Sequence, residues 1–107
     1  MSEQMPTIGR IVHYTLSSYD VDCINRRRKD ARDKMDWHRA LKTGAQVHIG
    51  NDVVEGQVYP MIITKLWGDT PTCAFNGSCF LDGNDIYWVT STSIGEGPSK
   101  ASWPARS

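Results

Sequence analysis

The sequence predicts a mainly β fold of the α+β class: a small five-stranded antiparallel barrel with a helical insert between its first and second strands. Two observations support this prediction. Residues 57–94 contain closely spaced β-branched and aromatic segments, separated by turn residues and without alternating helices. Residues 18–42 are instead highly charged and have helical periodicity. At 107 residues the chain is expected to form a single domain, residues 1–107, around one core.

The first strand is predicted over residues 8–16, where β-branched and aromatic residues partly alternate with others. Ser17 and Asp20 approximate a capping box, so a helix is expected to begin near residue 18. Within it, one stripe recurs at steps of three and four residues and could pack on the sheet: Val21, Ile24, Arg28, Ala31 and Met35. Gly44 is a natural stop, which places the insert at about residues 18–42.

Further strands are predicted by alternation over residues 45–49 and Val58–Trp67. Pro60 cannot donate to a strand ladder, which predicts an edge or a bulge near the beginning of the second of these. Turns are predicted at residues 68–71, at Asn76-Gly77 and at residues 82–85, before a strand that starts at Ile86. Residues 95–107 are expected to form an irregular tail in which Trp103 covers one end of the barrel.

Charge excludes some classes of partner. Twelve basic and twelve acidic residues give no net charge, which disfavours a general nucleic-acid or membrane-surface binder. The distribution is uneven: residues 20–42 carry eight basic and five acidic side chains, whereas residues 43–107 carry three and six. This polarity favours homo-oligomers or a small anion held near the helix. The sequence shows neither a signal peptide nor a stretch long enough to span a bilayer, so a cytoplasmic protein is expected.

Residues typical of metal or catalytic sites are scattered. Three histidines and three cysteines show no paired ligand spacing, so neither a metal nor another cofactor is expected. Cys73 and Cys79 flank Asn76, so a hairpin turning there could bring them together, and buried reduced thiols are the alternative. There is no nucleophile elbow, phosphate loop or paired catalytic carboxylate. The sequence therefore predicts a protein that is not an enzyme.

Aromatic and basic side chains remain as candidates for ligand binding. An aromatic plane stacks on a nucleotide base, and a guanidinium group pairs with its phosphates. The residues proposed for these two roles are Arg26, Arg27, Arg28, Trp67, Tyr87 and Trp88. The alternative interpretation makes the arginines a solvated helix face, with Arg28 at the core edge, and makes the aromatic residues core filling.

Several segments resemble a group of small uncharacterised proteins encoded by tailed bacteriophages and prophages. The resemblance covers about residues 6–16 and 45–104, and it is carried by residues 8–14, 59–67, 80–83, 88–91 and 103–104. It implies an SH3-like barrel and a phage origin, with the host cytoplasm as location. The matching residues look structural, and the resemblance implies no catalytic or binding residue.

Two hypotheses of function follow. In the first, an oligomeric sponge sequesters a nucleotide immune signal of the host without changing it, and so counters antiviral defence. In the second, the protein is an interaction module, associated with the virion or inhibiting a host protein, that presents the charged face of its helical insert. Nucleic-acid binding through the barrel is disfavoured by the absence of net charge.

Overall fold

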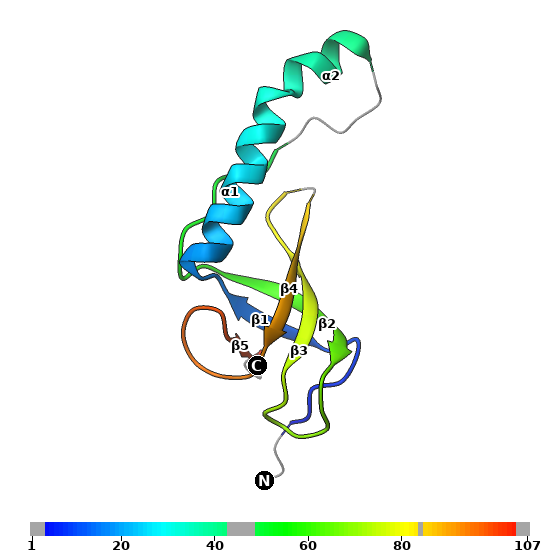
Figure 1. Cartoon of the computed structure of the whole chain (residues 1–107), viewed down its shortest axis with the longest axis vertical. Helices are drawn as coiled ribbons and strands as arrows, with labels where there is room; N and C mark the ends of the chain where they lie inside the picture. The colour runs from blue at the N-terminus through cyan, green and yellow to red at the C-terminus, as the bar shows by residue number, and fades with distance from the viewer. Residues whose placement is uncertain (1–3, 43–48, 84, 105–107) are drawn as a thin grey trace.

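The computed structural model describes residues 4–42, 49–83 and 85–104. Over these residues the chain forms one antiparallel sheet in the order β4-β3-β2-β1-β5, with two helices between β1 and β2 (Figure 1). The elements are β1 Ile11–Thr15, α1 Ser18–Asp33, α2 Met35–Leu41, β2 Val58–Leu66, β3 Phe75–Phe80, β4 Ile86–Thr92 and β5 Ala101–Ser102. The predicted mainly β, α+β class with a helical insert between the first two strands is confirmed.

The sheet is open. β4 and β5 are its two edges, and within the described residues no strand ladder joins them. They approach at one isolated bridge, between Ile94 and Ala101, beyond the end of β4. β5 is only two residues long, too short to pair along β4. The five-stranded antiparallel arrangement is therefore present, but the predicted closure into a barrel is not.

Most predicted elements lie close to the observed ones. Ser17 caps α1 through a complete capping box with Asp20, and the insert divides into two helices at Lys34. Pro60 pairs with His13 of β1. The pairing of β2 with β3 begins only at the next residue, Met61, so at Pro60 the strand has a partner on one side alone. The predicted strand at 45–49 falls mainly outside the described residues, and Ile49 is not in a strand. Part of the tail predicted as irregular forms β5.

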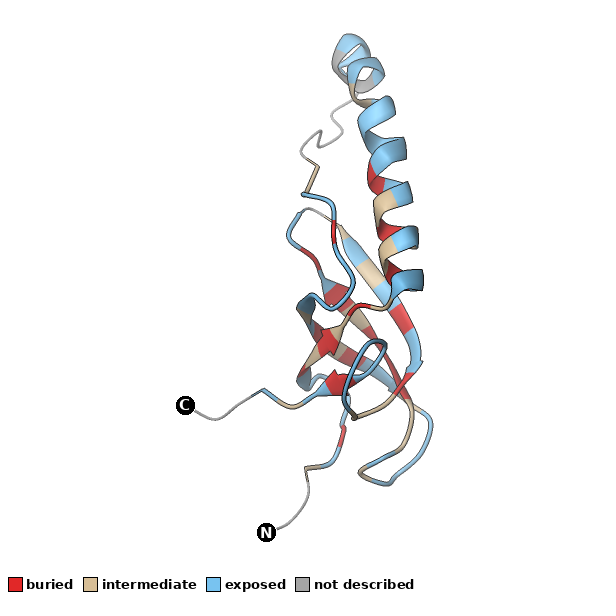
Figure 2. Ribbon diagram, turned by 90° about the vertical axis from the view of Figure 1, so that its left-hand side faces the viewer, coloured by how far each residue is buried: buried red, intermediate tan, exposed pale blue. Residues whose placement is uncertain are grey.

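The core lies between the inner face of the sheet and the N-terminal half of α1. Its largest fully buried side chains are Val12, Leu16, Ile24, Met61, Ile63, Phe75 and Cys79. Of the predicted helix stripe, only Ile24 and Arg28 are buried, and beyond Arg28 the helices project past the sheet (Figure 2). The molecule is therefore elongated: its radius of gyration is 16.1 Å, whereas a compact domain of this length has about 13 Å.

The predicted turn at Asn76-Gly77 is wrong. Both residues are buried in the middle of β3, and the chain instead turns between β2 and β3 over residues 67–74. The same correction applies to Cys73 and Cys79, which are free. Cys73 lies in the loop before β3 and Cys79 lies within β3, so no hairpin turn separates them.

Packing explains why this Asn-Gly pair lies in a strand. A Cβ atom at Gly77 would lie 2.7 Å from both the Ile62 carbonyl oxygen and the Met61 Cγ, so only glycine fits. The Asn76 Oδ1 accepts hydrogen bonds from the Trp67 indole at 3.0 Å and from the Ser91 backbone N–H at 2.8 Å. The register of β3 shifts against both neighbouring strands around this residue. The Asn76 side chain thus accepts from the Ser91 backbone N–H, which the irregular pairing of β3 with β4 leaves without a backbone acceptor.

Gly77→Ala is expected to lower the free energy of unfolding by about 1–3 kcal/mol, the usual cost of overpacking. The added methyl group would meet backbone, which cannot move aside as a side chain can. Urea denaturation measures the difference. Gly95→Ala is the matched control, because its Cβ would meet only the flexible Lys100 side chain, at 3.3 Å. Equal stability of the two variants would contradict the close packing at Gly77.

Candidate functional site

A groove of about 550 Å³ lies between α1 and the edge strand β4 and is here called the seam groove. It is lined by residues of β1, α1, β4 and the loop before β5, including Tyr14, Tyr19, Asp20, Cys23, Tyr87 and Trp88. Tyr19 and Trp88 are 72% and 64% exposed, so their rings are available to a ligand. Tyr87 and Trp88, both predicted site residues, are thus brought into one groove.

Asp20 holds the inner wall of this groove. Its Oδ2 accepts hydrogen bonds from the Tyr14 hydroxyl at 2.6 Å and from the Ser17 backbone N–H at 2.9 Å. Its Oδ1 accepts one from the Tyr87 hydroxyl at 2.7 Å. A single buried carboxylate therefore caps α1 and ties the helix to β1 and β4. The sequence predicts the cap, but not the tyrosine contacts, because residue 87 is far from residue 20 in the chain.

Two tyrosines and one cysteine in this region have raised pKa values. Burial, then the hydrogen bond to Asp20, raises the pKa of Tyr14 and of Tyr87 well above the ordinary value of tyrosine. Burial raises the pKa of the neighbouring Cys79 thiol to about 12. These groups are therefore neutral at physiological pH, where a thiol or phenol is a poor nucleophile. The Tyr14 and Tyr87 hydroxyls therefore line the groove as neutral groups.

Alkaline conditions are expected to destabilise the protein through Tyr14 and Tyr87. Their contribution to stability is complete below the unfolded tyrosine pKa of about 10 and is lost as the pH rises toward the higher folded values. Urea denaturation at a series of pH values should show a fall in the free energy of unfolding above about pH 10. The fall should be shallower in Tyr87→Phe, and an unchanged pH dependence would contradict the role of this hydroxyl.

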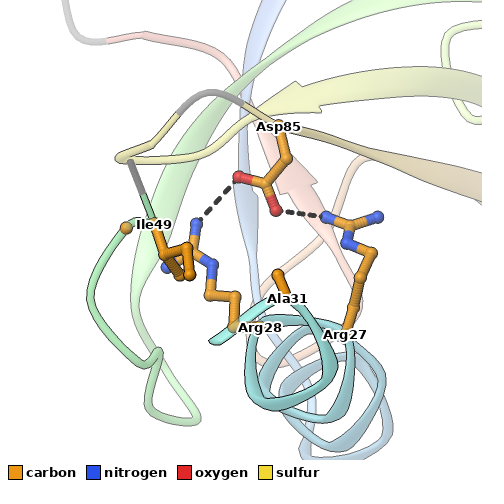
Figure 3. Close-up of a pocket in the computed structure, with 6 residues that line it drawn as sticks. Arg27, Arg28, Ala31, Ile49 and Asp85 are labelled. Atoms are coloured by element: carbon orange, nitrogen blue, oxygen red, sulfur yellow. Dashed lines mark hydrogen bonds and ion pairs between the residues drawn. The ribbon is translucent and has the colours of Figure 1, made fainter. Parts of the chain in front are cut away.

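Two of the predicted arginines meet in a smaller hollow, the arginine cleft, of about 120 Å³. It is lined by Arg27, Arg28, Ala31, Ile49, Gly50 and Asp85. Figure 3 shows the two guanidinium groups on either side of the Asp85 carboxylate. Asp85 accepts from Arg28 at 3.0 Å and from Arg27 at 2.7 Å. Partial burial opposes ionisation of Asp85, but these hydrogen bonds outweigh it and lower its pKa.

The other two predicted residues lie elsewhere. Arg26 lines a third, shallow hollow on the surface with Lys29, Arg32 and Asp52. Trp67 follows β2, where its indole donates to Asn76, and it lines neither the seam groove nor the arginine cleft. The predicted set therefore divides: Tyr87 and Trp88 line the seam groove, Arg27 and Arg28 line the arginine cleft, and Arg26 and Trp67 are apart from both.

The seam groove and the arginine cleft follow one another along the same two elements. On α1, Tyr19, Cys23 and Arg27 are four residues apart and form one row, and the first two line the groove. Tyr87 of the groove is the second residue of β4, and Asp85 of the cleft directly precedes this strand. An extended ligand could therefore contact aromatic rings at one end and guanidinium groups at the other.

Comparison with known proteins adds no assignment: no protein-family model, curated protein or solved structure matches the chain significantly. In the part of the chain that the structure describes, no three His, Cys, Asp or Glu side chains gather in a group that could hold a metal ion. Neither described helix has the length and apolarity needed to cross a bilayer.

Proposed function

We propose that this chain is a non-enzymatic binding protein that holds a small planar ligand in the seam groove. The observation that supports this most is the groove itself, which has the volume of typical ligand sites and exposes the rings of Tyr19 and Trp88. The Asp20 carboxylate in its wall already accepts hydrogen bonds from the Tyr14 and Tyr87 hydroxyls, so these groups are not free to bind a ligand. A ligand would then be held mainly by stacking on aromatic rings.

A nucleotide is the ligand class that best fits the groove and the adjoining arginine cleft. A base would stack between rings, and a charged group could reach toward Arg27. With the phage resemblance, this supports an anti-defence sponge that acts in the host cytoplasm and sequesters a nucleotide immune signal without changing it. We also propose that the protein forms a homo-oligomer. Its fold would be an SH3-like barrel only if the open sheet closed between β4 and β5.

The sponge is tested by thermal unfolding in the presence of a panel of cyclic and ADP-ribose-type nucleotides. A ligand at a hundred times its dissociation constant should stabilise the folded chain by about 2.7 kcal/mol. Mass spectrometry should recover that ligand unchanged. Trp88→Ala should abolish the stabilisation, whereas Trp37→Ala, which removes an exposed tryptophan on α2, should not. A panel without any stabilising nucleotide, or conversion of the ligand, would refute the proposal.

A second candidate, a protein-interaction module, is favoured by the outer face of the sheet. The strand registers align Ile11, Ile62, Ser78 and Trp88 in one row across β1 to β4. Phe80 and Ile86 pair beside this row, and none of these residues is charged. Ile11, Phe80, Ile86 and Trp88 are all exposed. Exposed apolar side chains grouped in this way are typical of a protein-binding surface.

The two candidates share Trp88 but differ in their other residues, so they can be separated at Ile11, which belongs to the sheet face alone. Affinity capture from infected host cells should recover a stoichiometric protein partner if the sheet face is the functional surface. Ile11→Asp should abolish that capture and leave nucleotide stabilisation intact, because residue 11 does not line the seam groove. Capture that survives this substitution would exclude the sheet face.

A further inference from the structure

The arginine cleft contains a buried donor that the described residues do not satisfy. Arg28 is only 2% exposed, although it is charged. One terminal nitrogen donates to the Asn51 carbonyl, and the other donates to the Asp82 carbonyl at 3.5 Å and to Asp85 at 3.0 Å. Its Nε has no hydrogen-bond partner among the described residues, although it is fully buried. Buried donors of this kind are rare in folded proteins and call for a partner.

The charges of the cleft are also unbalanced. Arg27 and Arg28 carry two positive charges, and Asp85, which they share, carries one negative charge. Each oxygen of Asp85 is already taken by one of the two arginines. One positive charge is therefore left over, and because Arg27 is only half-exposed and lines the cleft, this charge favours an anion in the adjoining space.

We propose that the arginine cleft binds a phosphate group, with the free guanidinium nitrogens of Arg27 as donors and the positive charge of Arg28 in the wall beside it. The space of about 120 Å³ corresponds to about four water molecules at about 30 Å³ each, which is enough for a small oxyanion. In Figure 3 it opens between the two arginine side chains, with Ala31 below and Asp85 above. Guanidinium groups are well suited to phosphate because their donors match its oxygens.

This site deepens the proposed function and rests on it for the identity of the whole ligand. Cys23 of the seam groove and Arg27 of the cleft are one helical turn apart, or about 5.4 Å. Tyr87 and Asp85, which directly precedes β4, are two residues apart, or at most about 7 Å along the chain. A nucleoside phosphate could therefore place its base in the groove and its phosphate in the cleft.

Arginine Nε–H resonances in a proton–nitrogen NMR spectrum report on this site directly. Titration with inorganic phosphate alone should shift the Arg28 signal in a saturable manner, and chloride at equal ionic strength should not. Ala31→Met should weaken phosphate binding by about tenfold or more, because it fills the cleft without changing its charge. Residue 31 is on the surface, so this variant is expected to fold.

Two further variants locate the anion. Arg27→Gln should weaken phosphate binding, and Arg26→Gln, which lines a different hollow, should leave it unchanged. An Arg28 signal that does not respond to phosphate in the wild-type chain, or equal losses in the Arg26 and Arg27 variants, would overturn the inference.

Failure of this inference can be told apart from failure of the proposed function. If an uncharged nucleoside binds the groove while phosphate leaves Arg28 unaffected, the groove function stands and the phosphate site is refuted. If phosphate binds but no nucleotide binds more tightly than phosphate alone, the site stands and the nucleotide function is refuted.

Discussion

Asp85→Ala is expected to lower the free energy of unfolding by about 1.5–3 kcal/mol, the usual range for a hydrogen bond to a charged group, because Asp85 is itself partly exposed. The substitution would leave Arg28, which is 2% exposed, without its carboxylate. Arg27 would lose the same partner, but at 45% side-chain exposure it can be solvated by water. Urea denaturation of the variant and the wild-type chain measures the effect.

Asp82→Ala is the matched control for Asp85. Its side chain is in the same turn, but only its backbone carbonyl contacts Arg28. It should therefore cost less than about 1 kcal/mol, as surface substitutions usually do. The double variant Asp85→Ala with Arg28→Met should regain part of the loss, because it also removes the uncompensated charge. Equal effects of the Asp82 and Asp85 substitutions would contradict this account of the cleft.

The contribution of the Arg28–Asp85 ion pair to stability should also depend on pH in the acid range. Because the folded pKa of Asp85 is lowered, its contribution is complete above the unfolded pKa of about 3.9 and is lost as the pH falls through the folded value. The stability of the wild-type chain should therefore fall more steeply below about pH 4 than that of Asp85→Ala.

Asp20→Ala is expected to cost about 3 kcal/mol in the free energy of unfolding. About 1 kcal/mol comes from the lost helix cap, and the rest comes from two tyrosine hydroxyls left without their acceptor. The bonds removed are those from Tyr14, Tyr87 and the Ser17 backbone. Thermal and urea unfolding measure the change.

Asp22→Ala provides the comparison for Asp20, because this acidic residue is also near the start of α1 but is exposed. It should change stability by less than about 0.5 kcal/mol. A loss at Asp20 no larger than about 1 kcal/mol would show that the cap alone matters and that the tyrosine contacts contribute nothing.

Local patterns predicted the elements whose structure is decided locally. The start of α1 follows from Ser17 and Asp20, which are neighbours along the chain, and β2 and β4 follow from their alternation. The Asn76-Gly77 turn was mispredicted because a local turn preference competes with packing of β3 against β2, which a sequence pattern does not show.

The candidate site was predicted only in part for a related reason. Helical periodicity already separates Arg26, Arg27 and Arg28 by about 100° each, so they could not form one patch. It does not indicate that Arg28 would be buried against Asp85, which is 57 residues away in the chain. Tyr14, Tyr19 and Asp20 were not proposed as site residues, because their common groove with Tyr87 exists only after the sheet has formed.

The position of Asn76 and Gly77 within β3 also bears on chemical ageing of the protein. An asparagine followed by glycine deamidates readily in a flexible chain, since the glycine nitrogen can swing round to attack the asparagine amide carbon. In the native strand both residues are buried and the Asn76 carboxamide is held by two donors. Isoaspartate at residue 76 would therefore accumulate only in molecules that have opened this part of the sheet, and its abundance in a stored sample would record how often they did so.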